Sequence, residues 1–96
     1  MENKIEKKSA FYMQIEDSYD LLGRMCVVGT VTLGSAAMGD TVILRTPAGV
    51  EFPARLGQIQ KGSALVSTLA TGDQVSLFLL DLILDKIPSG SVLYQK

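Results

Sequence analysis

The chain has 96 residues, which is enough for one domain with a modest hydrophobic core. It contains no histidine and a single cysteine, so it lacks the usual general base, the usual metal ligand and any internal disulfide. The net charge of −1 predicts no extended surface for anionic ligands, and although 47% of the residues are hydrophobic, no apolar run approaches the ~20 residues of a membrane helix.

The first nine residues are mostly charged and surround a lone Ile5. They lack the apolar core of a secretory signal, so we expect a flexible, solvated arm over residues 1–9 and a single domain over residues 10–96. The lone cysteine fits a reducing compartment, and we expect a cytoplasmic protein.

From Phe11 onward the sequence has the pattern of short strands. Phe11, Met13 and Ile15 alternate with polar residues, which predicts a strand with one buried face. Gly29 interrupts the next apolar stretch and predicts a bend or bulge. Further strands are predicted over residues 26–33, 41–45, 50–60, 74–79 and 91–94. Connections are expected over 17–24 and 35–38, and the apolar run 79–87 is too short and too continuous for an amphipathic helix.

Glycine and proline turns separate these strands at spacings of about 8–12 residues, which predicts a small β-sandwich or barrel. Gly39-Asp40 and Gly72-Asp73 each precede a strand, as expected of a tight turn used twice. No internal repeat longer than this turn is apparent.

The residues offer little for catalysis. Cys26 lies in an apolar strand without a histidine to activate it, so we expect a buried structural cysteine. The acidic residues at 16, 17 and 20 and at 81 and 85 lack calcium-loop spacing and are expected to be solvated. No phosphate-binding glycine motif occurs. We therefore expect no enzyme activity, no metal, no cofactor and no nucleotide.

The stretch Leu77–Leu84 is unusually apolar. Strand alternation explains Leu77 and Leu79, but not Leu82, Ile83 and Leu84, which follow an aspartate. These three side chains either pack beneath a loop or form an exposed interface, and the sequence leaves both alternatives open.

Several motifs follow one another in a fixed order. They are Phe11-x-x-x-Ile15-Glu16-Asp17, Gly23-Arg24, Val27-Val28-Gly29-Thr30-Val31, Gly34, Gly39-Asp40-Thr41-Val42, Gly57-Gln58-Ile59-Gln60, Ala70-Thr71-Gly72-Asp73-Gln74-Val75 and Ile87-x-x-Gly90-x-Val92-Leu93. This order resembles the second, β-barrel domain of translation GTPases such as elongation factor Tu, over residues 11–94. The resemblance implies an all-β, six- or seven-stranded antiparallel barrel, closed or nearly closed, with Val42, Leu44, Val75, Leu77 and Leu79 pointing inward.

In that family the barrel contacts the aminoacyl end of tRNA and faces the small ribosomal subunit. The resemblance implies that Gly23 and Arg24 contact ribosomal RNA and that Gln60 lines the pocket for the terminal adenosine. The Arg-Gly of the family is Leu80-Asp81 here, which replaces a cation with an apolar side chain and adds an anion. No counterpart of the GTPase domain is found, so GTP hydrolysis is not expected.

These observations favour a non-catalytic binding or adaptor module of the translation-factor type. Its expected ligand is a protein partner or a second copy of the chain, bound through Leu80, Leu82, Ile83 and Leu84. The alternative is a ribosome- or RNA-binding accessory protein that uses Gly23, Arg24 and Gln60. Membrane binding is not expected.

Overall fold

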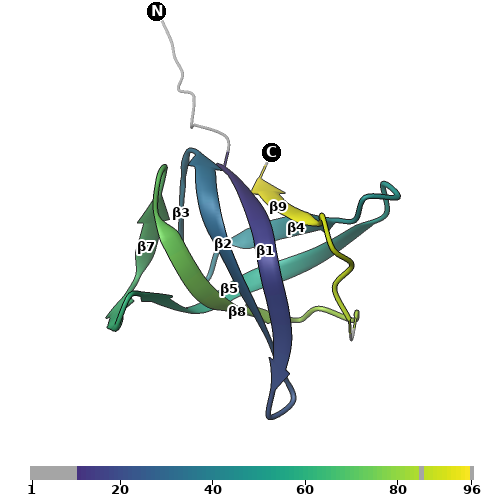
Figure 1. Cartoon of the computed structure of the whole chain (residues 1–96), viewed down its shortest axis with the longest axis horizontal. Helices are drawn as coiled ribbons and strands as arrows, with labels where there is room; N and C mark the ends of the chain where they lie inside the picture. Colours follow the sequence, from purple (N-terminus) through teal and green to yellow (C-terminus); the bar gives the residue numbers. More distant parts are fainter. Residues whose placement is uncertain (1–10, 85, 96) are drawn as a thin grey trace, which may run out of the picture.

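The computed structural model describes residues 11–84 and 86–95, so the predicted arm over residues 1–9 lies outside the described residues. The described part forms nine strands and contains no helix that could span a membrane (Figure 1). The strands are β1 Phe11–Leu21, β2 Arg24–Leu33, β3 Ser35–Ala37, β4 Thr41–Arg45, β5 Glu51–Lys61, β6 Ala64–Val66, β7 Thr68–Ala70, β8 Gln74–Leu80 and β9 Val92–Gln95.

Six of these strands close into an antiparallel barrel (Figure 1). Their order around the barrel is β4, β9, β1, β2, β8 and β5, and pairing between β5 and β4 closes the ring. The short strand β6 extends the sheet from β5, while β3 and β7 form a separate two-stranded sheet. The predicted all-β, six- or seven-stranded antiparallel barrel is therefore confirmed.

The barrel interior is filled by alternate side chains of its strands. Val75, Leu77 and Leu79 point inward from β8, and Val42 and Leu44 point inward from β4, as the resemblance implied. Burial of apolar area is the main stabilising contribution to such a core. The other fully buried core side chains are Phe11, Met13, Val27, Val31, Leu56, Ile59, Leu69 and Leu93.

A β-bulge in β1 lies opposite Gly29. The pairing runs from Ile15↔Gly29 to Asp17↔Val28, so Glu16 is the additional residue. The irregularity predicted at Gly29 is therefore present in this strand pair, but the additional residue lies in β1 and not in the strand that contains Gly29. The predicted connection over residues 17–24 is wrong, because β1 continues to Leu21 and the loop to β2 is only two residues long. The polar residues after the bulge belong to a hairpin that extends beyond the barrel (Figure 1), and most of residues 17–21 are exposed.

The two Gly-Asp turns are built in the same way. The carboxylate of Asp40 accepts a hydrogen bond from the Ala37 N–H, and that of Asp73 accepts one from the Ala70 N–H, both at 2.9 Å. The glycines that precede these aspartates have φ values of 96° and 91°, which glycine adopts at little cost. The tight turns predicted before β4 and β8 are thus confirmed.

Each turn bonds to a strand from the other half of the chain. The first turn exchanges backbone hydrogen bonds with Leu56 of β5, and the second does so with Val31 of β2. The strands before these turns, β3 and β7, pair with each other. In the sequence, this repeat corresponds to the pattern Ala-x-Gly-Asp-x-Val-x-Leu, which occurs at residues 37–44 and again at 70–77. The expectation that the chain has no internal repeat longer than the turn is therefore wrong.

Candidate binding surface

The hairpin that joins β1 and β2 ends in the residues Leu22 and Gly23. Both have positive φ, 55° and 84°, which is the pattern of a type I′ turn, and the Gly23 N–H donates to the Asp20 carboxylate at 2.7 Å. Asparagine, aspartate or glycine normally occupies the first position of this turn, because at positive φ a Cβ crowds the backbone carbonyl; glycine has no Cβ, and asparagine and aspartate compensate by local hydrogen bonds. A leucine at this position that is 97% exposed contributes neither favourable backbone geometry nor packing.

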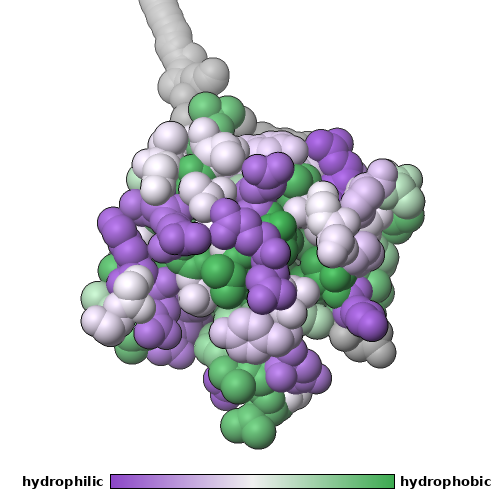
Figure 2. All heavy atoms as spheres, in the orientation of Figure 1, coloured by the Kyte–Doolittle hydropathy of each residue, from purple (hydrophilic) through white to green (hydrophobic). Residues whose placement is uncertain are grey.

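Further apolar side chains surround this leucine. Tyr19 and Leu21 are each about half-exposed on the same hairpin. Figure 2 shows the resulting apolar surface at the end of the hairpin, at the bottom of the view. Exposed apolar groups that gather at a strained turn are a feature of interaction surfaces rather than of inert loops.

The segment after β8 turns sharply at Asp81, which has a φ of 63°. Its carboxylate accepts a hydrogen bond from the Arg55 side chain at 3.0 Å and forms an ion pair with it. Leu82 and Leu84 then pack partly against the barrel core, whereas Ile83 between them is 88% exposed. Leu82 and Leu84 thus follow the first alternative, packing, whereas Ile83 is exposed and its role in an interface stays a prediction.

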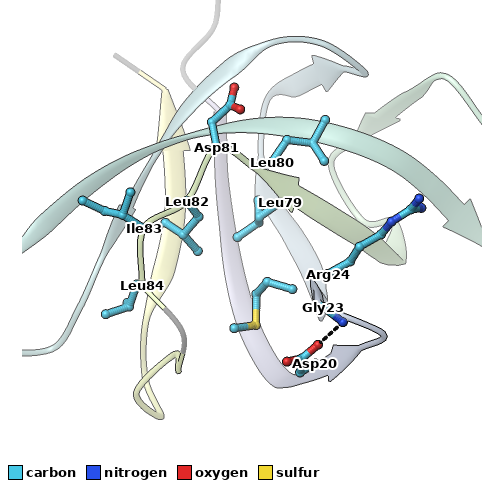
Figure 3. A pocket seen from close by; sticks show the side chains of 10 residues that line it. Asp20, Gly23, Arg24, Leu79, Leu80, Asp81, Leu82, Ile83 and Leu84 are labelled. Atoms are coloured by element: carbon cyan, nitrogen blue, oxygen red, sulfur yellow. Dashed lines mark hydrogen bonds between the residues drawn. The ribbon is translucent and has the colours of Figure 1, made fainter.

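The hairpin and this segment enclose a hollow of about 400 Å³ (Figure 3). We call it the end hollow; its lining residues are Asp20, Gly23, Arg24, Met25, Leu79, Leu80, Asp81, Leu82, Ile83 and Leu84. The hollow contains all four predicted interface residues and two of the three predicted RNA contacts. The tertiary structure thus joins two groups that the sequence had assigned to different ligands.

Gln60, the third predicted RNA contact, lies outside this hollow. It lines a smaller depression of about 180 Å³ on the outer face of the barrel, together with Tyr19, Leu21, Cys26, Gln58, Ser76, Leu77 and Phe78. The Gln60 side-chain amide donates to the Gly62 carbonyl at 3.2 Å. Gln60 therefore lines a different hollow from Gly23 and Arg24.

Cys26, the single cysteine of the chain, also lines the outer depression. Cys26 is 5% exposed, as expected for a structural cysteine. A hydrogen bond with the Cys26 side chain is the main cause that raises the pKa of Tyr19 above its ordinary value. The two side chains face each other across β1 and β2, where Tyr19 and Cys26 are paired.

Two of the five arginines and lysines of the described residues are paired with carboxylates. Arg55 pairs with Asp81 and Lys61 pairs with Asp73, each at 3.0 Å. Arg24 lies over the Phe78 ring at 5.6 Å from its centroid. Exposed ion pairs such as these add little stability, but they do neutralise cations that a phosphate backbone would use.

Leu22 is the residue of this surface that the sequence analysis did not single out. The signal in the sequence is a Leu-Leu pair directly before the turn glycine, where polar residues are the rule. Leu22 stands out in the structure because of its positive φ and its near-complete exposure. Both result from its place in the two-residue loop between β1 and β2.

Comparison with known proteins gives no matching family model and no matching curated protein. Solved structures do match. The apo translation elongation factor SelB of Methanococcus maripaludis is 23% identical with a TM-score of 0.78, over 96% of this chain and 20% of that chain. The same factor in complex with the GTP analogue GppNHp is also 23% identical at 0.78, over 97% of this chain and 21% of that chain.

A bacterial selenocysteine-specific elongation factor, EF-Sec, is 21% identical with a TM-score of 0.74, over 95% of this chain and 15% of that chain. The chain thus spans about a fifth or less of the length of these factors. At this level of identity the similarity establishes the fold. The chain has the fold of a β-barrel domain of translation elongation factors, as the ordered motifs predicted.

Proposed function

We propose that the chain is a non-catalytic protein-binding module whose partner docks on the end hollow. The observation that carries the proposal is that six of the ten residues lining the end hollow are apolar, among them the 88% exposed Ile83, while Leu22 beside the lining residue Gly23 is 97% exposed. An exposed apolar rim around a concave surface is the arrangement that a partner side chain fills. The resemblance to translation factors supports a role as a module of a larger translation-related assembly.

Local electrostatics favour a protein partner over RNA. Asp20 and Asp81 line the end hollow beside Arg24, which is its one cation among the described residues. RNA binding depends on several uncompensated cations, because release of counterions from phosphates drives it. The alternative, an RNA contact through Arg24 and Gln60, rests on the stacked Arg24–Phe78 pair beside the outer depression.

The proposal is tested by capture of proteins and nucleic acids from native lysate on the immobilised chain, at low and high salt. The informative variants are Leu22→Asn and Ile83→Asn. The matched control is Leu65→Asn, because Leu65 is 64% exposed on β6 and does not line the hollow. Burial of one leucine contributes roughly 1.5–3 kcal/mol, so each informative variant should weaken capture by about tenfold or more.

Leu22→Asn separates loss of binding from loss of folding, because asparagine relieves the strain at a positive φ and should not destabilise the barrel. Protein capture that persists at high salt, falls in both variants and survives in the control supports the proposal. Gel filtration of the purified chain shows whether the partner is a second copy. Capture unaffected by both variants contradicts the proposal. Recovery of RNA that falls steeply with salt and is reduced by Arg24→Ala instead identifies the RNA alternative.

The proposal includes no cofactor, metal or nucleotide, and it places the module in the cytoplasm, where the buried thiol of Cys26 stays reduced.

A further inference from the structure

The second half of β1 has a free edge. β1 pairs with β9 over Phe11–Gln14 and donates one further hydrogen bond, from the Ile15 N–H to the Ser91 carbonyl at 3.2 Å. After the bulge, residues 17–21 pair with β2 on one side. On the other side they pair with none of the described strands.

The exposed backbone groups of this edge belong to Ser18 and Asp20. In a hairpin with a two-residue loop, the residues that flank the loop form the hydrogen-bonded pair, here Leu21 and Arg24. The direction of the backbone groups alternates along a strand, so the N–H and C=O of Ser18 and Asp20 point away from β2. The Ser18 N–H donates to the exposed carboxylate of the adjacent Asp17 at 2.9 Å, a local contact that an incoming strand can replace.

A groove runs along this edge. Its volume is about 410 Å³, and one wall consists of four consecutive residues of β1, Asp17, Ser18, Tyr19 and Asp20. Lys86, Ile87 and Ser89 form the opposite wall, and Met25 also lines it. Asp20 and Met25 line the end hollow as well, so the groove and the end hollow adjoin at these two residues. Four residues of an extended chain advance about 13 Å, which matches the free part of β1.

The charged side chains beside this edge indicate which kind of strand can pair with it. Asp17 and Asp20 lie on the groove with one cation, Lys86, so the groove lining is acidic on balance. Glu16 at the bulge adds a further carboxylate on the sheet surface, where it accepts hydrogen bonds from Thr30 and Gln74. A second copy that paired through the same edge would place these carboxylates near their own counterparts, and like charges across strands are destabilising. A segment that carries lysine or arginine would be attracted instead.

We propose that the edge of β1 over residues 17–21 accepts an extended, basic segment of a partner protein as an additional strand. This inference rests on the proposed function and specifies how its partner binds. Backbone hydrogen bonds to Ser18 and Asp20 hold the segment, its basic side chains face the carboxylates, and its apolar side chains contact Met25 and Ile87. The same segment then continues into the end hollow.

The test uses the full chain and three short synthetic peptides. One alternates lysine and valine, the second alternates glutamate and valine, and the third is the lysine peptide with alternate backbone N-methyl groups that remove its donors. Binding is followed by titration of amide resonances and by hydrogen exchange. The lysine peptide should bind, shift the Ser18 and Asp20 amides and slow their exchange. The glutamate and N-methylated peptides should bind at least about fivefold more weakly, because opposite charges and ladder hydrogen bonds each add to strand pairing.

Two variants of the chain isolate the edge. Ser18→Pro removes an N–H that points away from β2 and blocks strand addition; proline is tolerated there because no described strand pairs with that edge of β1. Asp17→Lys reverses the charge and keeps the backbone, so it remains informative if the proline variant folds poorly. Glu51→Lys is the matched charge control, because Glu51 lies at the start of β5 and does not line the groove. Ser18→Pro and Asp17→Lys should weaken binding of the lysine peptide by about fivefold or more, and Glu51→Lys should not.

Failure of this inference and failure of the proposed function give different results. Lysate capture that is lost in Leu22→Asn but unchanged in Ser18→Pro and Asp17→Lys, with no protection of the Ser18 and Asp20 amides, overturns strand addition and leaves the protein-binding function standing. No binding of any peptide means that the carboxylates only protect the edge from pairing, which also overturns the inference. Slower exchange at residues of the end hollow alone would overturn it too, since the peptide would then bind without using the edge.

Discussion

The substitution Gly29→Ala tests the packing of β1 on β2. A Cβ at this position would lie 2.1 Å from the Gln14 carbonyl oxygen and 2.9 Å from the Met13 Cε. The flexible methionine can move away, but the carbonyl belongs to the backbone of β1 directly before the bulge. The two strands would have to separate locally by about 1 Å to restore an ordinary contact.

The cost follows from these contacts. Overpacking that shifts the backbone costs typically about 1–3 kcal/mol, and each weakened ladder hydrogen bond costs about 1 kcal/mol more. Alanine regains about 0.5–1 kcal/mol because it has less freedom than glycine in the unfolded chain. The free energy of unfolding should therefore fall by about 2–3 kcal/mol. For a domain of this size the Tm should fall by about 10–20 °C.

Thermal and urea unfolding followed by circular dichroism measure this change. Gly57→Ala is the matched comparison, because a Cβ at Gly57 would lie 3.2 Å from the Leu80 and Phe78 side chains and from the Phe78 carbonyl oxygen. Neither glycine has a positive φ, so backbone strain does not differ between the two substitutions. Gly57→Ala should be the milder change. An unchanged Tm for Gly29→Ala, or a larger loss for Gly57→Ala, would refute the close approach of β1 to β2.

Three further predictions concern the turns and the segment after β8. Leu22→Asn should raise the Tm by a few degrees, because it relieves about 1 kcal/mol of strain at a positive φ; a lower Tm would contradict this. Asp73→Asn should destabilise at neutral pH, because hydrogen bonds from the Ala70 N–H and from Lys61 hold the pKa of Asp73 below its usual value of 3.8. A lowered folded-state pKa stabilises the fold above the unfolded value and loses this effect as the pH falls, so the Tm gap between variant and wild type should close below about pH 4; a pH-independent gap would exclude the charge as its cause. Leu82→Asp should lower the Tm, because Leu82 packs against the core, whereas Ile83→Asp should leave it unchanged; equal Tm values in scanning calorimetry would count against this packing.

Much of the barrel follows from local sequence. Alternation placed Phe11, Met13 and Ile15 on the inner face of β1, and Gly29 indicated an irregularity in this strand pair, although not that the additional residue is in β1. The hairpin was missed for a related reason. The bulge shifts the alternation of β1 at Glu16, so residues 17–21 look like a loop until the register with β2 is known.

The candidate site was only partly accessible to the sequence. The apolar run after β8 identified Leu80, Leu82, Ile83 and Leu84 as unusual, but which of them is exposed depends on the turn at Asp81. The free edge of β1 cannot be predicted from the sequence, because it arises where β1 continues beyond the residues that pair with β9.

By itself, the sequence determined the fold class, the inward-facing residues and the absence of histidine chemistry, because composition, period-two alternation and turn residues act over a few positions. Only the tertiary structure brought Gly23 and Arg24 of the hairpin together with Leu80–Leu84 in one hollow and separated Gln60 from them. Closure of the barrel decides these distances, since it sets the register of strands that are distant in sequence. The chemical character of the proposed binding surface therefore depends on local residues, whereas its location depends on closure of the barrel.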